Sequence, residues 1–69
     1  MLNTPEAYRD AGLKAGTAAK RHDWACRNFH KDWFRRALAL ESESDRDEAR
    51  RLFDEGYRDG NPAPVPCLF

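Results

Sequence analysis

The first forty residues carry one continuous helical pattern, which restricts the possible folds more than any other feature of the chain. Between residues 8 and 29, apolar and small side chains recur at alternating spacings of three and four, as in the seam between two packed helices. No Gly or Pro interrupts residues 24–40. Thr4 is a suitable N-cap, and Pro5 suits the first helical position. The sequence therefore predicts one helix from about residue 5 to residue 40.

One segment could interrupt this helix: the polar run Lys20-Arg21-His22-Asp23, in which Asp23 would act as a new N-cap. The seam continues in phase through His22, so we predict a continuous helix. A break at this point would instead favour a three-helix bundle. At about 1.5 Å per residue the continuous helix would be roughly 50 Å long. A chain of 69 residues is too short to cover such a helix, which favours a dimer.

The first half of the seam consists mainly of small side chains, with Gly12 and Gly16 beside it. Each glycine costs about 1 kcal/mol relative to Ala inside a helix, and close approach of a second helix is a reason to tolerate that cost. The alternative is that the glycines loosen a frayed helix end. We predict that the seam is the interface of a homodimer, formed by Tyr8, Ala11, Gly12, Ala15, Ala18 and His22.

A second and shorter helix is predicted from about Asp45 to Gly60. Ser44 followed by Asp47 resembles a capping box at its start, and Pro62 prevents continuation beyond its end. The apolar positions of this helix recur at i, i+3 and i+4, and they are Ala49, Leu52, Phe53, Gly56 and Tyr57.

The predicted fold is an all-α helical hairpin, with a long first helix, a shorter second helix and a dimeric state. It divides the chain into a hairpin domain at residues 1–60 and an extended, proline-rich tail at residues 61–69. The tail ends in apolar residues, and it either packs on the chain's own core or serves as a docking peptide. Folding back at Ser42 would place Ala49 opposite Ala37, Phe53 opposite Trp33 or Phe34, and Tyr57 near Phe29.

Simple features of the sequence argue against several classes of protein. The N-terminus has neither the basic nor the apolar region of a signal peptide, and the longest apolar run is too short to cross a membrane. Two cysteines, Cys26 and Cys67, are too few for a disulfide framework and indicate a reducing environment. We therefore expect a cytoplasmic protein that does not insert into membranes.

His22, Cys26 and His30 recur at intervals of four residues and would share one face of the predicted helix. Zinc binds such side chains, and Cys67 would be available as a fourth ligand. No second pair of ligands accompanies them, so we interpret them as ordinary packed residues and predict no metal or cofactor. A Cys–His catalytic pair would need an orienting group and an oxyanion pocket. A hairpin of this size cannot easily build these, so we predict that the chain is not an enzyme.

Charge is distributed unevenly along the chain, although the total is zero. Residues 14–36 contain seven basic and two acidic side chains, whereas residues 41–59 contain eight acidic and four basic ones. This division suits a basic helix packed against an acidic one better than a surface that binds nucleic acid. DNA binding through the basic face of the first helix is the alternative, with Lys20, Arg21, Arg27, Lys31 and Arg35 as contacts.

Trp24 lies on the helix face opposite the seam, surrounded by basic and polar side chains. Trp and Arg are enriched among the residues that dominate the binding energy of interfaces. Two alternatives stay open: the proline-rich tail covers Trp24, or Trp24 stacks on Arg21 in a cation–π pair. We predict a partner-binding surface formed by Trp24, Lys20, Arg21, Lys31 and Arg35.

Two phrases resemble the helical accessory proteins of temperate bacteriophages: AYRDAGLKAG at residues 7–16 and GYRDG at residues 56–60. In length and hairpin plan the chain is similar to small phage proteins that bind and inhibit host regulators, including inhibitors of quorum sensing. The resemblance implies a dimeric, non-enzymatic protein that binds a bacterial host protein, such as a transcription regulator, in the cytoplasm of the host.

Overall fold

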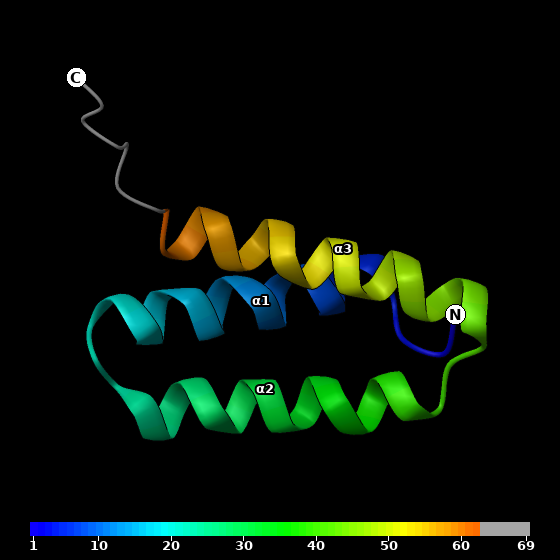
Figure 1. The fold of residues 1–69 in the computed structure, drawn as a ribbon, viewed down its shortest axis with the longest axis horizontal. Coiled ribbons are helices and arrows are strands. Elements are labelled where there is room, and N and C mark those ends of the chain that lie inside the picture. Colours follow the sequence, from blue (N-terminus) through cyan, green and yellow to red (C-terminus); the bar gives the residue numbers. More distant parts are fainter. Residues whose placement is uncertain (63–69) are drawn as a thin grey trace.

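The computed structural model describes residues 1–62, and within them the chain forms three helices and no strands (Figure 1). The helices are α1 (Pro5–Lys20), α2 (Trp24–Ala39) and α3 (Glu43–Gly60). The predicted all-α class is confirmed. The predicted continuous helix over residues 5–40 is wrong, because the first helix ends at Lys20 and the hairpin becomes a three-helix arrangement. The predicted tail spans residues 61–69, and all of it beyond Pro62 lies outside the described residues.

The residue that follows the C-cap of the first helix has a left-handed backbone, which the helical pattern of the sequence does not reveal. His22 has a φ of 58°, which is uncommon for a residue other than Gly. Its backbone N–H donates to the carbonyl of Ala19 at 3.0 Å, and that of Asp23 donates to the carbonyl of Ala18 at 2.8 Å. This pair of bonds is the Schellman motif, which satisfies the last carbonyls of a helix. The Asp23 side chain then accepts from the backbone N–H of Cys26 at 3.1 Å and caps α2.

The chain reverses a second time between α2 and α3, and α3 begins at Glu43, two residues before the predicted start near Asp45. Ser42 is the N-cap of α3, so the predicted start after Ser44 is wrong. The Ser42 hydroxyl donates to the carboxylate of Asp45 at 3.0 Å. From the first turn of α3, Arg46 donates two hydrogen bonds, of 3.2 and 3.3 Å, to the last carbonyls of α2. These polar contacts hold the end of α2 against the start of α3.

The helices α1 and α3 run parallel and in backbone contact, because α2 returns the chain to the side where α1 begins (Figure 1). A Cβ added to Gly12 would lie 2.1 Å from the carbonyl oxygen of Phe53, and one added to Gly56 would lie 2.1 Å from that of Arg9. Only glycine permits so close an approach. Each helix carries two such glycines, four residues apart: Gly12 and Gly16 on α1, and Gly56 and Gly60 on α3.

The small-residue seam is therefore covered by α3 of the same chain. The predicted dimer interface rested on the premise that the chain is too short to cover its own first helix, and this premise is wrong. The early end of α1 lets the chain reverse twice, so that α3 lies alongside α1. Dimerisation itself stays a prediction. Of the six residues assigned to that interface, His22 is exposed, and the buried ones are Tyr8, Ala11, Gly12, Ala15 and Ala18.

Aromatic and small side chains form the core where the three helices meet. Tyr8, which is fully buried, packs with Ala37 and Ala49. Phe34 lies against this cluster and stacks on Phe53, with ring centroids 4.1 Å apart. Phe53 lies against Phe34 as predicted, and Ala37 and Ala49 belong to the same buried cluster as Tyr8.

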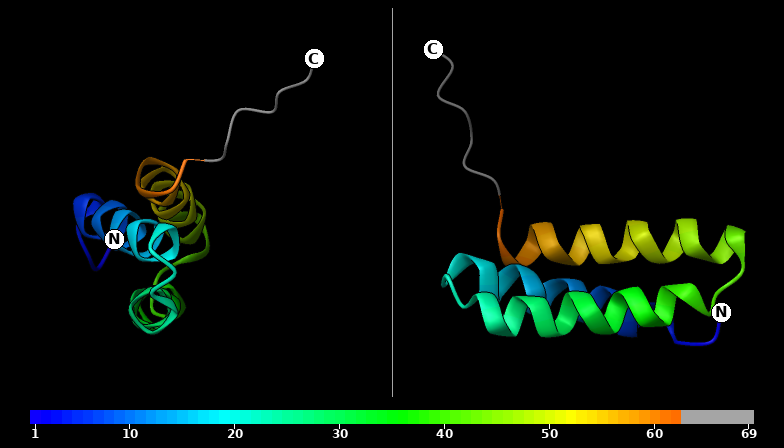
Figure 2. Two further views of the ribbon diagram at one scale, coloured as in Figure 1. Left: turned by 90° about the vertical axis from the view of Figure 1, so that its left-hand side faces the viewer. Right: turned by 60° about the horizontal axis from the view of Figure 1, so that its bottom comes forward.

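The helix α2 is the least buried of the three. It packs on α1 and has little contact with α3, and the end-on view in Figure 2 shows the end of α1 lying between the other two helices. Ala37 is its only buried residue. Tyr57 does not pack on Phe29 as predicted, because Phe29 is 69% exposed and Tyr57 lies beside Phe53. Most of the surface of α2 is therefore left uncovered by the rest of residues 1–62.

We expect Gly12→Ala and Gly56→Ala to destabilise the protein. A Cβ at either position meets the opposite backbone, and forcing α1 and α3 apart should cost about 1–3 kcal/mol. That exceeds the roughly 1 kcal/mol that Ala gains over Gly in a helix. Urea unfolding followed by circular dichroism measures the difference. Ser44→Ala, at an exposed position of α3, is the control. A glycine variant more stable than the wild type would contradict the backbone contact.

Candidate protein-binding surface

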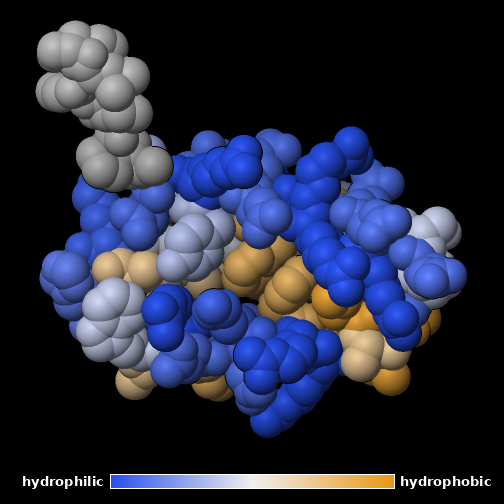
Figure 3. All heavy atoms as spheres, in the orientation of Figure 1, coloured by the Kyte–Doolittle hydropathy of each residue, from blue (hydrophilic) through white to orange (hydrophobic). Residues whose placement is uncertain are grey.

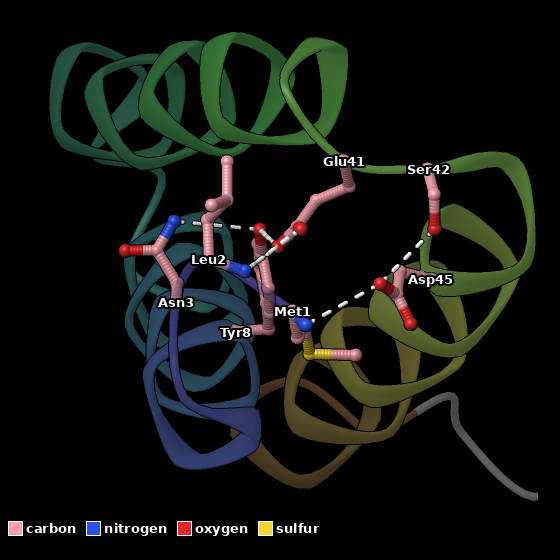
Figure 4. Close-up of polar contacts among 7 residues, drawn as sticks. All are labelled: Met1, Leu2, Asn3, Tyr8, Glu41, Ser42 and Asp45. Carbon is pink, nitrogen blue, oxygen red and sulfur yellow. Dashed lines mark hydrogen bonds and ion pairs between the residues drawn. The ribbon is translucent and has the colours of Figure 1, made fainter.

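Glu41 is the one charged residue that is buried among residues 1–62, with 5% of its surface exposed. Its carboxylate accepts hydrogen bonds from the hydroxyl of Tyr8 and from the backbone N–H of Leu2, the latter at 2.8 Å (Figure 4). Asn3 donates to the Tyr8 hydroxyl at 3.4 Å. The hydrogen bond from Tyr8 lowers the pKa of Glu41. Burial, together with the neighbouring Glu41, raises the pKa of Tyr8.

This buried cluster has a structural role. It ties the N-terminal segment and α1 to the turn between α2 and α3, and the α-amino group of Met1 adds an ion pair with Asp45 at 3.3 Å (Figure 4). Each buried polar side-chain atom in residues 1–62 has a hydrogen-bond partner. The sequence does not single out Glu41, because this residue looks like one more acid in the polar segment that follows residue 40.

We expect the contribution of Glu41 to stability to disappear in acid. Its pKa is lower in the folded protein than the usual value of 4.5. The ionised carboxylate therefore stabilises the fold above that value, and the effect is lost as the pH falls through the folded pKa. Urea unfolding of the wild type and of Glu41→Gln, near pH 7 and near pH 3, tests this. The stability difference between the two proteins should shrink in acid, and an equal difference at both values would show that ionisation plays no part.

Trp24 opens α2 and is 48% exposed. The guanidinium of Arg27 lies over its ring, 4.7 Å from the centroid, and the ring centroid of His22 lies 5.6 Å away. The alternative in which Trp24 stacks on Arg21 is wrong, because the helix breaks between these two residues. Arg27, one turn after Trp24 on α2, forms the cation–π pair instead. The alternative in which the tail covers Trp24 concerns residues outside those described.

A stripe of cations continues from Trp24 along α2. Arg27, Lys31 and Arg35 follow one another at intervals of four residues, so they lie on one face of the helix. None of the three forms an ion pair with another residue of the described range. We call Trp24 and these three residues the cation stripe. The remaining predicted contacts lie across the link, at the exposed end of α1, and they are Lys20 and Arg21.

The cation stripe borders an apolar groove between α2 and α3. The floor of the groove is formed by Phe34 and Leu38 from α2 and by Phe53 and Tyr57 from α3. Figure 3 shows apolar side chains exposed between the polar surfaces of the two helices. The groove is not expected from the sequence, because the predicted hairpin places the facing side chains in a closed core. The rims of the groove are charged, with Lys31 and Arg35 on α2 and Asp54 on α3.

The opposite flank of α2 exposes aromatic side chains next to α1. Phe29 is 69% exposed, and Trp33 is 37% exposed. The ring of Trp33 packs beside that of Tyr8, with centroids 5.9 Å apart, so Trp33 belongs only partly to the core in which the sequence placed it. The charged side chains beside these aromatics are paired within the chain, Asp10 with Lys14 and Asp32 with Arg36.

His22, Cys26 and His30 do not share a helix face, because His22 lies in the link before α2. Within residues 1–62, no group of three or more His, Cys, Asp or Glu side chains is placed to hold a metal ion. None of the helices in this part of the chain is long and apolar enough to cross a membrane.

No protein-family model, no curated protein and no solved structure matches the chain.

Proposed function

We propose that the chain is a non-enzymatic protein that binds another protein through α2. One observation supports this above all others: Trp24, Lys31 and Arg35 are exposed on a helix whose only buried residue is Ala37. An exposed Trp beside basic side chains is typical of the residues that dominate interface energy. Because the cations of the stripe have no ion-pair partner in the described part of the chain, they are available to acidic groups of a partner.

The sequence resemblance supports a bacterial host protein, such as a transcription regulator, as the partner of a phage-type inhibitor in the host cytoplasm. The two phrases that carry the resemblance meet at the contact between α1 and α3. Arg9 of the first phrase pairs with Asp59 of the second, and also with Glu55 at 3.1 Å. These phrases therefore build the scaffold, and recognition of the partner is assigned to α2. Inhibition would follow from covering a surface that the partner needs.

Binding of DNA is the second candidate, and the cation stripe favours it. The acidic composition of α3 and the apolar groove beside the stripe weigh against it. The two functions differ in their response to salt, because each phosphate neutralised adds about −0.9 to the slope of log affinity against log salt concentration. Gel shifts with random duplex DNA at two salt concentrations separate them: steeply salt-dependent binding would favour the DNA function.

We also propose that two copies of the chain associate through the other flank of α2. Phe29 and Trp33 are exposed there, and the charged side chains beside them already have partners within the chain. A second copy can therefore approach without like-charge repulsion, and burial of the aromatic surface favours association.

Light scattering at micromolar concentration should give twice the mass of the chain. Phe29→Ser should return the protein to the mass of one chain, because it removes the most exposed aromatic of this flank. Its helix content by circular dichroism should be unchanged, because Phe29 contributes little to the core. Trp24→Ala is the matched control on the opposite side of α2 and should stay dimeric. A wild type with the mass of a single chain would contradict the proposal.

Trp24→Ala should leave the melting temperature nearly unchanged, because the side chain is about half exposed and its ring lies against the nearby side chains of Arg27 and His22. It should weaken binding of the protein partner by at least about 2 kcal/mol. The partner is first captured from bacterial lysate on the wild type and identified by mass spectrometry, and its affinity for each variant is then measured by calorimetry.

Trp33→Ala is the control for this experiment. It should lower the melting temperature, because the Trp33 ring packs beside the buried Tyr8. A Trp24→Ala protein that is fully stable and binds the partner as tightly as the wild type would rule out the assigned surface.

A further inference from the structure

The groove between α2 and α3 exists because both helices pack on α1 and have little contact with each other. The two helices are joined at the turn near Glu41 and lie apart at the other end of the molecule (Figure 1). Such a space between two helices on a common support has the shape that a further helix fills in a four-helix bundle.

The floor of the groove is already arranged to receive apolar side chains. Phe34 and Leu38 lie one turn apart on α2, and Phe53 and Tyr57 lie one turn apart on α3. Phe34 stacks on Phe53, and this contact joins the α2 side of the groove floor to the α3 side. Phe34, Leu38 and Tyr57 are each only partly covered. A helix lying along the groove would place residues at i, i+3 or i+4, and i+7 against these side chains.

The charges on the two rims of the groove determine which charge the bound helix should carry along each of its edges. Lys31 and Arg35 lie one turn apart on the α2 rim, and neither has an ion-pair partner within residues 1–62. On the α3 rim, Asp54 is the one charged residue that lines the groove. A ligand helix with acidic residues at i and i+4 on the side of α2 would pair with both cations. A ligand helix that is basic on this side would be repelled by them.

A second copy of the chain does not provide this ligand. Its α2 carries the same cations. The acids of its α3 are mostly engaged within the chain, with Asp47 next to Arg50 at 3.6 Å and Glu48 next to Arg51 at 3.3 Å. Glu55 is likewise paired, with Arg9 of α1.

We propose that the groove between α2 and α3 binds an amphipathic helix of another protein, whose apolar face is bordered on one edge by acidic residues. The assignment rests on the proposed protein-binding function and adds the class of ligand to it. The ligand helix would complete the bundle, with its apolar face on the groove floor and its acidic edge on Lys31 and Arg35.

The first experiment uses a fluorescein-labelled synthetic peptide of about five helical turns. Its Leu residues are spaced at i, i+3, i+4 and i+7, and Glu residues at i and i+4 occupy one edge. A second peptide has Lys in place of each Glu and the same Leu residues. Fluorescence anisotropy with the full chain should show binding of the Glu peptide and at least tenfold weaker binding of the Lys peptide. Failure of the Glu peptide to bind at high micromolar protein concentration would overturn the assignment.

The second experiment reverses the rim charges of the groove. The double variant Lys31→Glu and Arg35→Glu should lose at least tenfold in affinity for the Glu peptide and should gain affinity for the Lys peptide. The matched control is Lys20→Glu and Arg21→Glu, which makes the same change in net charge at residues that do not line the groove. All four side chains are exposed, so circular dichroism should show unchanged folding. An equal loss in both double variants would overturn the assignment, because it would mean general charge attraction.

The third experiment tests whether the chain occupies its own groove. A chain that ends at Pro62 should bind the Glu peptide with unchanged affinity. A large gain in affinity on truncation would assign the groove to residues 63–69 of the same chain and overturn an external ligand. The wider proposal is judged separately. If the peptides fail but capture of a protein partner still depends on Trp24, the groove assignment falls and the protein-binding function stands.

Discussion

The backbone contact between α1 and α3 is the interaction on which the rest of the structure depends. Gly12 and Gly56 bring the two helices so close that a single methyl group on either would meet the opposite carbonyl. Two helices that pack in parallel within one chain need a connection that returns to the starting end. The helix α2 supplies it, and its 16 residues equal the length of α1. The position of α2 is thus a consequence of the glycine contact.

The same contact determines how little of α2 is buried. Helices that meet through glycine and alanine need few large side chains between them, and Tyr8 and Phe53 are the main large residues of the buried core. A core of this kind has little apolar surface left to cover a third helix. Polar groups fix both ends of α2 instead: the carboxylate of Asp23 caps its start, and Arg46 binds its last carbonyls. A helix held at its ends can keep its sides free for a partner.

The two sides of α2 differ in a way that suits two contacts. On one side Lys31 and Arg35 border the apolar groove and form no ion pair with another residue of the range 1–62. On the other side Phe29 and Trp33 are exposed between charges that are already paired. Unpaired charge favours a partner of opposite charge, whereas a neutral apolar surface favours self-association. The buried Glu41 supports both sides indirectly, since it fixes the turn from which α2 and α3 diverge.

The sequence by itself determined the local features of this protein. The repeat of Ala49, Phe53 and their neighbours identified α3, and the polar surroundings of Trp24 identified an exposed aromatic residue. The glycines indicated a close helix contact, but the same residues suit contact within a chain and contact between chains. Only the tertiary structure decided between them, through the left-handed His22 that ends α1. The three-and-four spacing of the seam continues without a shift through the link at His22, so helical periodicity cannot reveal that the helix breaks there. The groove likewise depends on the distance between α2 and α3. This distance follows from the packing of both helices on α1, and no single residue of the sequence determines it.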